Sequence, residues 1–254
     1  MSTRLPLWLL ATGSFCLVAA QLGSGPARYE VVSIKPSEEQ NTNKTFRFAA
    51  DGGFRAGNYS LKDLIRLGWD VRDFQISGGP TWLNTERYNV QAKPDAPFNP
   101  HSPQGQERYR EMVQTMLHER FHLQVHQQQK EMSVSFLTVT ARGARLKRTG
   151  DTPDLSTQMG DGKGHMWATK FDLSLLARYL SGELGYPVLD QTGLAGVYDF
   201  ELTWNPDEGK PSSEMDPRPS MVKAIKEQLG LELKRGKGMV EVVVVESAEK
   251  AIGN

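Results

Sequence analysis

Two stretches of the chain share one pattern of hydrophobic positions. Residues 54–90 and 166–204 present apolar side chains in the same order, at offsets from 166−54=112 to 198−88=110. The matching positions are Phe54, Tyr59, Leu61, Leu64 and Tyr88 in the first stretch, and Met166, Phe171, Leu173, Leu176 and Tyr198 in the second. A pattern that recurs at one spacing predicts an internal duplication.

The first half opens with strand and turn patterns. After an expected strand over residues 29–34, two runs rich in β-forming residues, 45–49 and 54–59, flank Asp51-Gly52-Gly53 and predict a hairpin. Ser60, followed three residues later by Asp63, predicts a helix N-terminus with a capping box. A strand is expected over residues 87–92.

The second half repeats this order. Asp172 stands where Ser60 stands and predicts the N-cap of a helix. The alternation of Tyr198, Phe200 and Leu202 predicts a strand, and Ser220 predicts the cap of a last helix, which runs to residue 229.

Each half is expected to close with a helix and a hairpin. In the first half the helical spacing of residues 106–120 changes at Phe121 to strand spacing, and a second strand is expected over residues 134–139. In the second half the strands 231–234 and 240–245 are expected to join at a turn formed by Arg235-Gly236-Lys237-Gly238. The offset between the two ends is 233−125=108.

The predicted architecture is α+β, with two tandem, duplicated ββαβαββ modules whose helices pack on mainly antiparallel sheets. The expected parts are a signal peptide over residues 1–20, a linker over 21–28, a first module over 29–148 and a second over 149–254. The Pro-rich segments 94–103 and 205–219 are expected to be corresponding loops.

The N-terminus has the pattern of an export signal. Arg4 precedes an apolar run from Leu5 to Val18, and Val18-Ala19-Ala20 is a small-residue cleavage pattern. The run of about 14 residues is shorter than the roughly 20 that a membrane helix needs, so no transmembrane span is expected in the mature chain. The protein is therefore expected to be periplasmic or extracellular, without disulfides, because Cys16 is the only cysteine.

Charge excludes one class of partner. The chain has 30 basic and 30 acidic residues. It therefore has no overall basic field for nucleic acid, and no nucleic-acid partner is expected.

Several segments resemble a known family. Residues 30–37 (EVVSIKPS), 75–83 (QISGGPTWL), 120–126 (RFHLQVH), 187–200 (PVLDQTGLAGVYDF) and 228–231 (QLGL) are similar to the soil-associated family of secreted acidobacterial proteins, whose function is unknown. More weakly, the helix, Leu-Gly and strand pattern is similar to the short N-terminal modules of secretins and outer-membrane receptors, which bind proteins in the periplasm. Neither resemblance implies catalytic residues.

One sequence motif suggests a metal site. His118-Glu119-Arg120-Phe121-His122 matches the zinc-protease pattern HExxH, with His126 as a possible third ligand. That chemistry needs both histidines one turn apart on one helix, whereas the change of period at Phe121 places His122 on a strand. Solvent-facing or cross-strand histidines are the favoured interpretation, so no metal, cofactor or catalytic residue is assigned.

Other motifs have structural interpretations. The segment Asp190-Gln191-Thr192-Gly193 resembles the DTG pattern of aspartic proteases, but Gln191 interrupts it. The first half has no corresponding aspartate, so Asp190 is expected to cap a turn. The basic segments 142–148 and 234–237 are expected to be solvated hairpin tips or edge-strand gatekeepers. Trp69, Trp82, Trp167 and Trp204 are expected to be core or core-rim residues.

The resulting hypothesis is a non-enzymatic exported protein that binds a protein partner of the cell envelope through sheet edges or through the loops 94–103 and 205–219. Two alternatives stay open. One is a zinc-dependent hydrolase that uses His118, Glu119 and His122, and the other is a carrier with an apolar ligand pocket between the halves.

Overall fold

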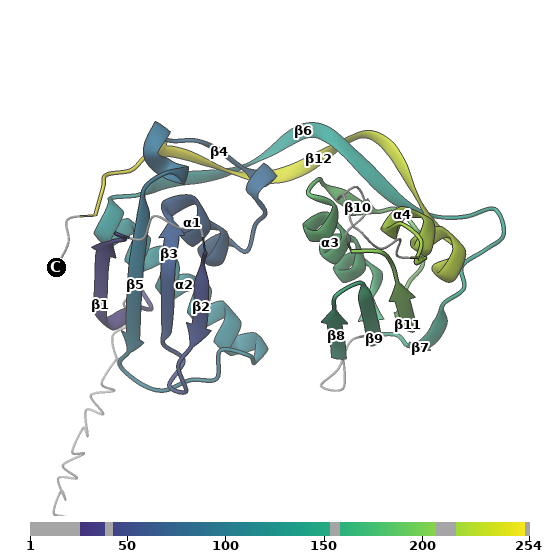
Figure 1. Cartoon of the computed structure of the whole chain (residues 1–254), viewed down its shortest axis with the longest axis horizontal. Helices are drawn as coiled ribbons and strands as arrows, with labels where there is room; N and C mark the ends of the chain where they lie inside the picture. Colours follow the sequence, from purple (N-terminus) through teal and green to yellow (C-terminus); the bar gives the residue numbers. More distant parts are fainter. Residues whose placement is uncertain (1–25, 39–42, 153–157, 207–216, 252–254) are drawn as a thin grey trace, which may run out of the picture.

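The structure is a computed structural model that describes residues 26–38, 43–152, 158–206 and 217–251. The expected signal peptide, and its only cysteine, Cys16, lie outside these residues. Two α+β lobes lie on the same side of one long ribbon made by β6 (Gln124–Val139) and β12 (Leu231–Ser247) (Figure 1). The predicted α+β class, with mostly antiparallel sheets, is confirmed.

The first lobe has a four-stranded antiparallel sheet in the order β1-β5-β3-β2. The predicted hairpin around Asp51 is confirmed, because β2 and β3 pair antiparallel. Its elements are β1 (Tyr29–Pro36), β2 (Thr45–Phe48), β3 (Phe54–Ser60), α1 (Leu61–Trp69), η1 (Asp73–Gln75), β4 (Ile76–Gly78), η2 (Thr81–Asn84), β5 (Arg87–Pro94) and α2 (Pro103–Phe121).

The second lobe has a sheet in the order β7-β11-β9-β8, which repeats the first order when β7 is matched with β1 and β8 with β2. Its elements are β7 (Lys147–Gly150), β8 (Gln158–Gly162), β9 (His165–Asp172), α3 (Leu173–Leu184), β10 (Val188–Asp190), β11 (Val197–Thr203), α4 (Met221–Ala224) and the π-helix η3 (Ile225–Leu229). This correspondence matches what a duplication would give, although the duplication itself stays a prediction.

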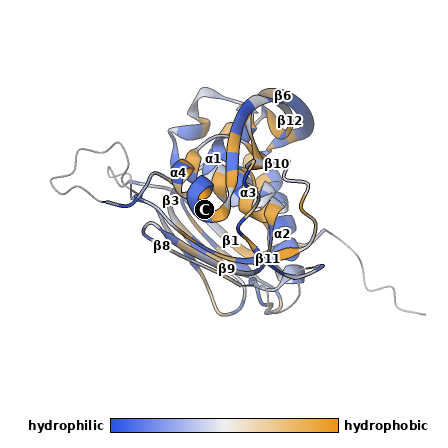
Figure 2. Ribbon diagram, turned by 90° about the vertical axis from the view of Figure 1, so that its right-hand side faces the viewer, coloured by the Kyte–Doolittle hydropathy of each residue, from blue (hydrophilic) through white to orange (hydrophobic). Residues whose placement is uncertain are grey.

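Hydrophobic side chains between sheet and helices form the two cores. Figure 2 shows hydrophobic segments on the helices and on the strands beneath them. In the first lobe Phe54, Leu64 and Phe121 are almost completely buried, and in the second Met166 and Leu176 are. The shared apolar pattern of the sequence therefore forms one core in each lobe.

The two predicted closing hairpins are wrong, because each is one continuous strand. β6 (Gln124–Val139) and β12 (Leu231–Ser247) pair antiparallel along their whole length. Gly236 and Gly238 lie mid-strand, where a Cβ on Gly236 would come within 2.7 Å of the Phe136 ring. These glycines make room for packed side chains, since a strand glycine often marks a close approach rather than a turn.

The ribbon contributes to both cores. β10 joins β6 in parallel at the second lobe, and β4 joins β12 in parallel at the first. Val243 and Val245 belong to the first core, although they lie in the C-terminal part of the chain, and Leu137 and Leu231 belong to the second. The predicted boundary at residues 148/149 falls within β7, and Val243 and Val245 from the second half of the chain pack with the first lobe.

Candidate functional site

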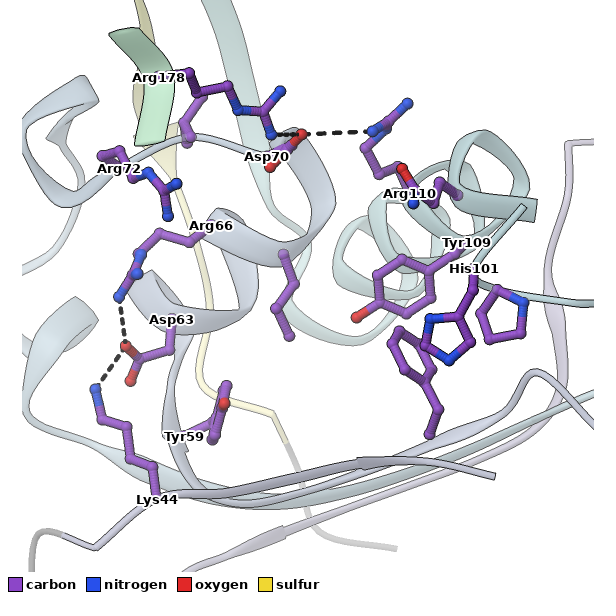
Figure 3. A pocket seen from close by; sticks show the side chains of 15 residues that line it. Lys44, Tyr59, Asp63, Arg66, Asp70, Arg72, His101, Tyr109, Arg110 and Arg178 are labelled. Carbon is purple, nitrogen blue, oxygen red and sulfur yellow. Dashed lines mark hydrogen bonds and ion pairs between the residues drawn. The ribbon is translucent and has the colours of Figure 1, made fainter. Parts of the chain in front are cut away.

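An open pocket of about 400 Å³ lies where the first lobe meets α3 of the second. We call it the interlobe pocket, and Figure 3 shows its lining. The residues that line it are Lys44, Phe48, Tyr59, Asp63, Arg66, Leu67, Asp70, Val71, Arg72, Pro100, His101, Gln106, Tyr109, Arg110 and Arg178. A volume of this size suits a small ligand.

Helix α1 supports one wall of the pocket. The predicted capping box is confirmed: the Ser60 hydroxyl accepts a hydrogen bond from the Asp63 amide at 3.1 Å, and Asp63 Oδ2 accepts one from the Ser60 amide at 3.0 Å. The helix ends at Asp70, whose backbone is left-handed with φ 52°. The cap and the helix end therefore position Asp63 and Asp70, with Arg66 between them.

Asp63 is the centre of a charged network in the first lobe. Its carboxylate lies 2.7 Å from Lys44 Nζ and 3.2 Å from Arg87 Nη1. Burial, the largest single influence, raises the pKa of Asp63, but hydrogen bonds from Lys44 and Ser60 and the charge of Lys44 together lower it below its usual value. Asp63 is therefore ionised at neutral pH and is already occupied by its own partners.

Asp70 joins the two lobes. Its carboxylate pairs with Arg110 of α2, whose Nη1 lies 3.5 Å away, and with Arg178 of α3. In Figure 3 the two guanidinium groups approach Asp70 from opposite sides. One carboxylate thus holds cations from both lobes at the edge of the pocket.

The lining of the pocket is positively charged. Five cations face two carboxylates, a balance of 5−2=+3. When the adjacent Asp73 and Arg87 are included, the balance is 6−3=+3. Arg72 forms no ion pair with any residue that the structure describes. Its guanidinium lies against α3, because a Cβ on Gly182 would be 3.1 Å from Arg72 Cζ.

Tyr109 supplies a buried hydroxyl to this pocket. The residue is 7% exposed, and its hydroxyl has no hydrogen-bond partner within the described parts of the chain. Burial, with smaller contributions from Tyr29 and Tyr59, raises the pKa of Tyr109 far above its usual value, so the hydroxyl stays protonated. An unpaired buried hydroxyl costs about 1–3 kcal/mol, and its natural role is to donate a hydrogen bond.

Aromatic rings and the predicted loop 94–103 complete the wall. The Phe48 ring contacts the Tyr109 ring edge to face at 5.1 Å and the His101 ring at 5.4 Å. Pro100 and His101 line the pocket from this loop. The other predicted loop, 205–219, lies mostly outside the described residues. The interlobe pocket therefore has an apolar wall beside a cationic one.

The HExxH motif does not bring its histidines together. His118 is exposed in the last turn of α2, and His122 is the left-handed C-cap of that helix rather than a strand residue as expected. His122 Nδ1 lies 3.0 Å from Glu249, and His126 Nδ1 lies 2.8 Å from Glu246. Within the described residues no group of three His, Cys, Asp or Glu side chains could hold a metal ion.

The structure also decides three other interpretations of the sequence. Asp190 Oδ1 accepts the Thr192 amide at 2.8 Å, which confirms its role as a turn cap. Trp204 is buried, but Trp167 is 41% exposed on the second sheet, so its assignment to a core or core rim is wrong. The expected basic tip at 234–237 is also wrong, since these residues lie within β12.

The comparison with protein families gives one match. A family model described as "Protein of unknown function (DUF3738)" matches residues 62–248, more than half of the chain. The chain belongs to the DUF3738 family. No curated protein and no solved structure matches it. Most of the interlobe pocket lies inside the DUF3738 match, including both aspartates and all four of its arginines.

The described helices include none that is long and apolar enough to cross a membrane. The pocket residues themselves were missed in the sequence, because they belong to no short motif and Tyr109 reads as part of an apolar helix face. One signal was available. Arg66 and Arg178 are separated by 178−66=112, the same offset as the repeated apolar positions.

Proposed function

We propose that this DUF3738 protein is a non-enzymatic, exported binding protein of the cell envelope that receives a ligand, or a group of its partner, in the interlobe pocket. The observation that carries the proposal is a solvent-open cavity of the first lobe that Arg178 of the second lobe borders, with Asp70 held by a cation from each lobe. Sites between two lobes are common places for ligands.

The envelope location is supported by the export pattern of residues 1–20 and by the resemblance to secreted acidobacterial proteins and, more weakly, to secretin and receptor modules. A binding role is favoured over hydrolysis because His122 and His126 each pair with a different glutamate. The two acids that line the pocket are neutralised by cations, so neither carboxylate is free to act as a general base.

Native mass spectrometry after incubation with an envelope extract tests this proposal. The full chain is expected to retain a ligand and to release it with the mass that it had before binding. A Gln106→Trp variant, which fills the pocket, should lose it, and Gln104→Trp on the same helix outside the pocket should keep it. Equal retention by both variants, or release of a ligand with altered mass, would contradict the proposal.

A further inference from the structure

We infer that the interlobe pocket binds an organic oxyanion, a carboxylate or phosphate attached to an apolar body, with Arg72 as the principal counter-charge and Tyr109 as a hydrogen-bond donor. The inference rests on the proposed function and names the class of ligand. Charge, an unpartnered donor and an apolar wall each support it independently.

The charge balance points to an anion. Both carboxylates of the pocket are bound by cations, and the balance of +3 is unchanged when the next shell of ion pairs is included. Arg72 is held against Gly182 by packing rather than by a carboxylate of the described residues. A guanidinium placed in this way presents a planar pair of donors that suits a carboxylate or a phosphate.

Tyr109 points to a ligand rather than to a merely charged surface. Its hydroxyl is buried and lacks a partner among the described residues. Figure 3 shows the ring projecting from α2 toward the pocket space, on the side opposite Arg66 and Arg72. A tyrosine that served packing alone would do so equally well as phenylalanine, whereas a donor aimed into a cationic cavity is suited to an oxyanion.

The apolar wall indicates that the anion is attached to a larger group. Phe48, Leu67 and Val71 line the pocket together with the ring of Tyr59. An inorganic ion would leave this wall in contact with water, while an apolar body would cover it. We therefore expect an amphipathic ligand with its oxyanion near Arg72 and Tyr109.

Isothermal titration of the full chain with four probes tests the inference. Phenyl phosphate and benzoate carry the two oxyanions on one ring, benzyl alcohol is their neutral counterpart, and inorganic phosphate lacks the ring. We expect at least one of the two aromatic anions to bind, the neutral probe not to bind, and inorganic phosphate to bind more weakly. Which aromatic anion binds more tightly distinguishes a phosphate ligand from a carboxylate ligand. Anion affinity should fall as salt is added.

Two variants test the assigned residues, and a third is the matched control. Arg72→Gln is expected to weaken binding of the aromatic anion at least tenfold, and Tyr109→Phe about fivefold, since each removes a charge-assisted contact. Arg55→Gln removes an exposed charge from β3, outside the pocket, and should change affinity less than about twofold. Thermal melts and circular dichroism show whether each variant is folded.

The inference is overturned if neither aromatic anion binds, if benzyl alcohol binds equally well, or if Arg72→Gln and Arg55→Gln behave alike. The proposed function can be judged separately. If the anions do not bind but a species from the envelope extract is still retained and is lost in Gln106→Trp, only the oxyanion assignment fails. If nothing is retained either, both fail.

Discussion

The two lobes have the same order of strands, yet the helices that follow their central hairpins are capped very differently. In the first lobe Ser60 and Asp63 form a capping box, and Asp63 also binds Lys44 and Arg87. In the second lobe Asp172 caps α3 through one hydrogen bond, from the Ser174 amide at 2.7 Å. The shared apolar pattern forms the cores, whereas the charged network belongs to one lobe and stands beside the pocket.

The helices before the ribbon differ in a similar way. In the first lobe α2 has 19 residues and presents Gln106, Tyr109 and Arg110 to the pocket from its first turns. In the second lobe the matching helical segment begins at Met221 and is shorter, with 4 residues in α4 and 5 in η3. The additional turns of α2 therefore supply binding groups that the second lobe does not provide from its matching helix.

Disrupting the shared ribbon should have the largest effect. Val243→Asp places a charge in the first core, where Val243 is completely buried, and is expected to cost about 4 kcal/mol or more of stability. Hydrogen exchange should rise first in β4 and the rest of the first lobe. Met239→Asp, at a position 55% exposed on the same strand, should change stability by less than about 0.5 kcal/mol. If exchange rose mainly in the second lobe, the assignment of residues 243–245 to the first core would be wrong.

The difference between the two helix caps can be measured directly. Asp63→Asn removes the charge that Lys44 and Arg87 bind and should lower stability by about 2–3 kcal/mol. Asp172→Asn retains a capping side chain and should cost about 1 kcal/mol or less. Chemical denaturation of both variants checks this. Equal losses would show that the first-lobe network adds nothing to an ordinary cap.

The pH dependence of stability should test the charged network of Asp63. Since the folded pKa of Asp63 is lowered, its stabilising effect is fully present above its unfolded pKa and is lost as pH falls through the folded value. The stability difference between wild type and Asp63→Asn should thus be constant above about pH 5 and shrink in the acid range. Denaturation at pH 7 and pH 3 measures it, and a difference that grew in acid would contradict the ion-pair account.

A smaller effect is expected at the contact between the lobes. Asp70→Asn raises the charge of the pocket from +3 to +4 and releases Arg110 and Arg178. Affinity for the aromatic anion should increase about two- to threefold, a modest gain because all these groups are partly exposed and screened by salt. A loss of affinity in titrations with this variant would mean that Asp70 positions the arginines for the ligand rather than competing with it.

Much of the fold could be predicted because its signals are local. Ser60, Asp172 and Ser220 all cap helices as expected, since a capping side chain bonds to amides only two or three residues away. The ribbon could not be predicted, because the segment that contains Gly236 and Gly238 has the amino-acid composition of a turn. Only their packing against Phe136 and Leu189, more than 40 residues away, shows that they continue a strand.

The candidate site was hidden for a related reason. Arg72 and Arg178 line one pocket only because of the arrangement of the two lobes, and no local spacing in the sequence connects them. By contrast, the motif that looked most chemical, from His118 to His122, is divided by the end of α2. Helix ends and lobe contacts, rather than residue types, decided which side chains came together.

The most direct test follows the arginine side chains during binding. Nitrogen-15 NMR of the guanidinium Nε–H groups, recorded while phenyl phosphate is added to the full chain, reports each arginine separately. We expect the signals of Arg66, Arg72, Arg110 and Arg178 to shift together along one binding curve, while those of Arg47 and Arg55 on the first sheet stay in place. If the sheet arginines shifted and the pocket arginines did not, the pocket would not be the binding site.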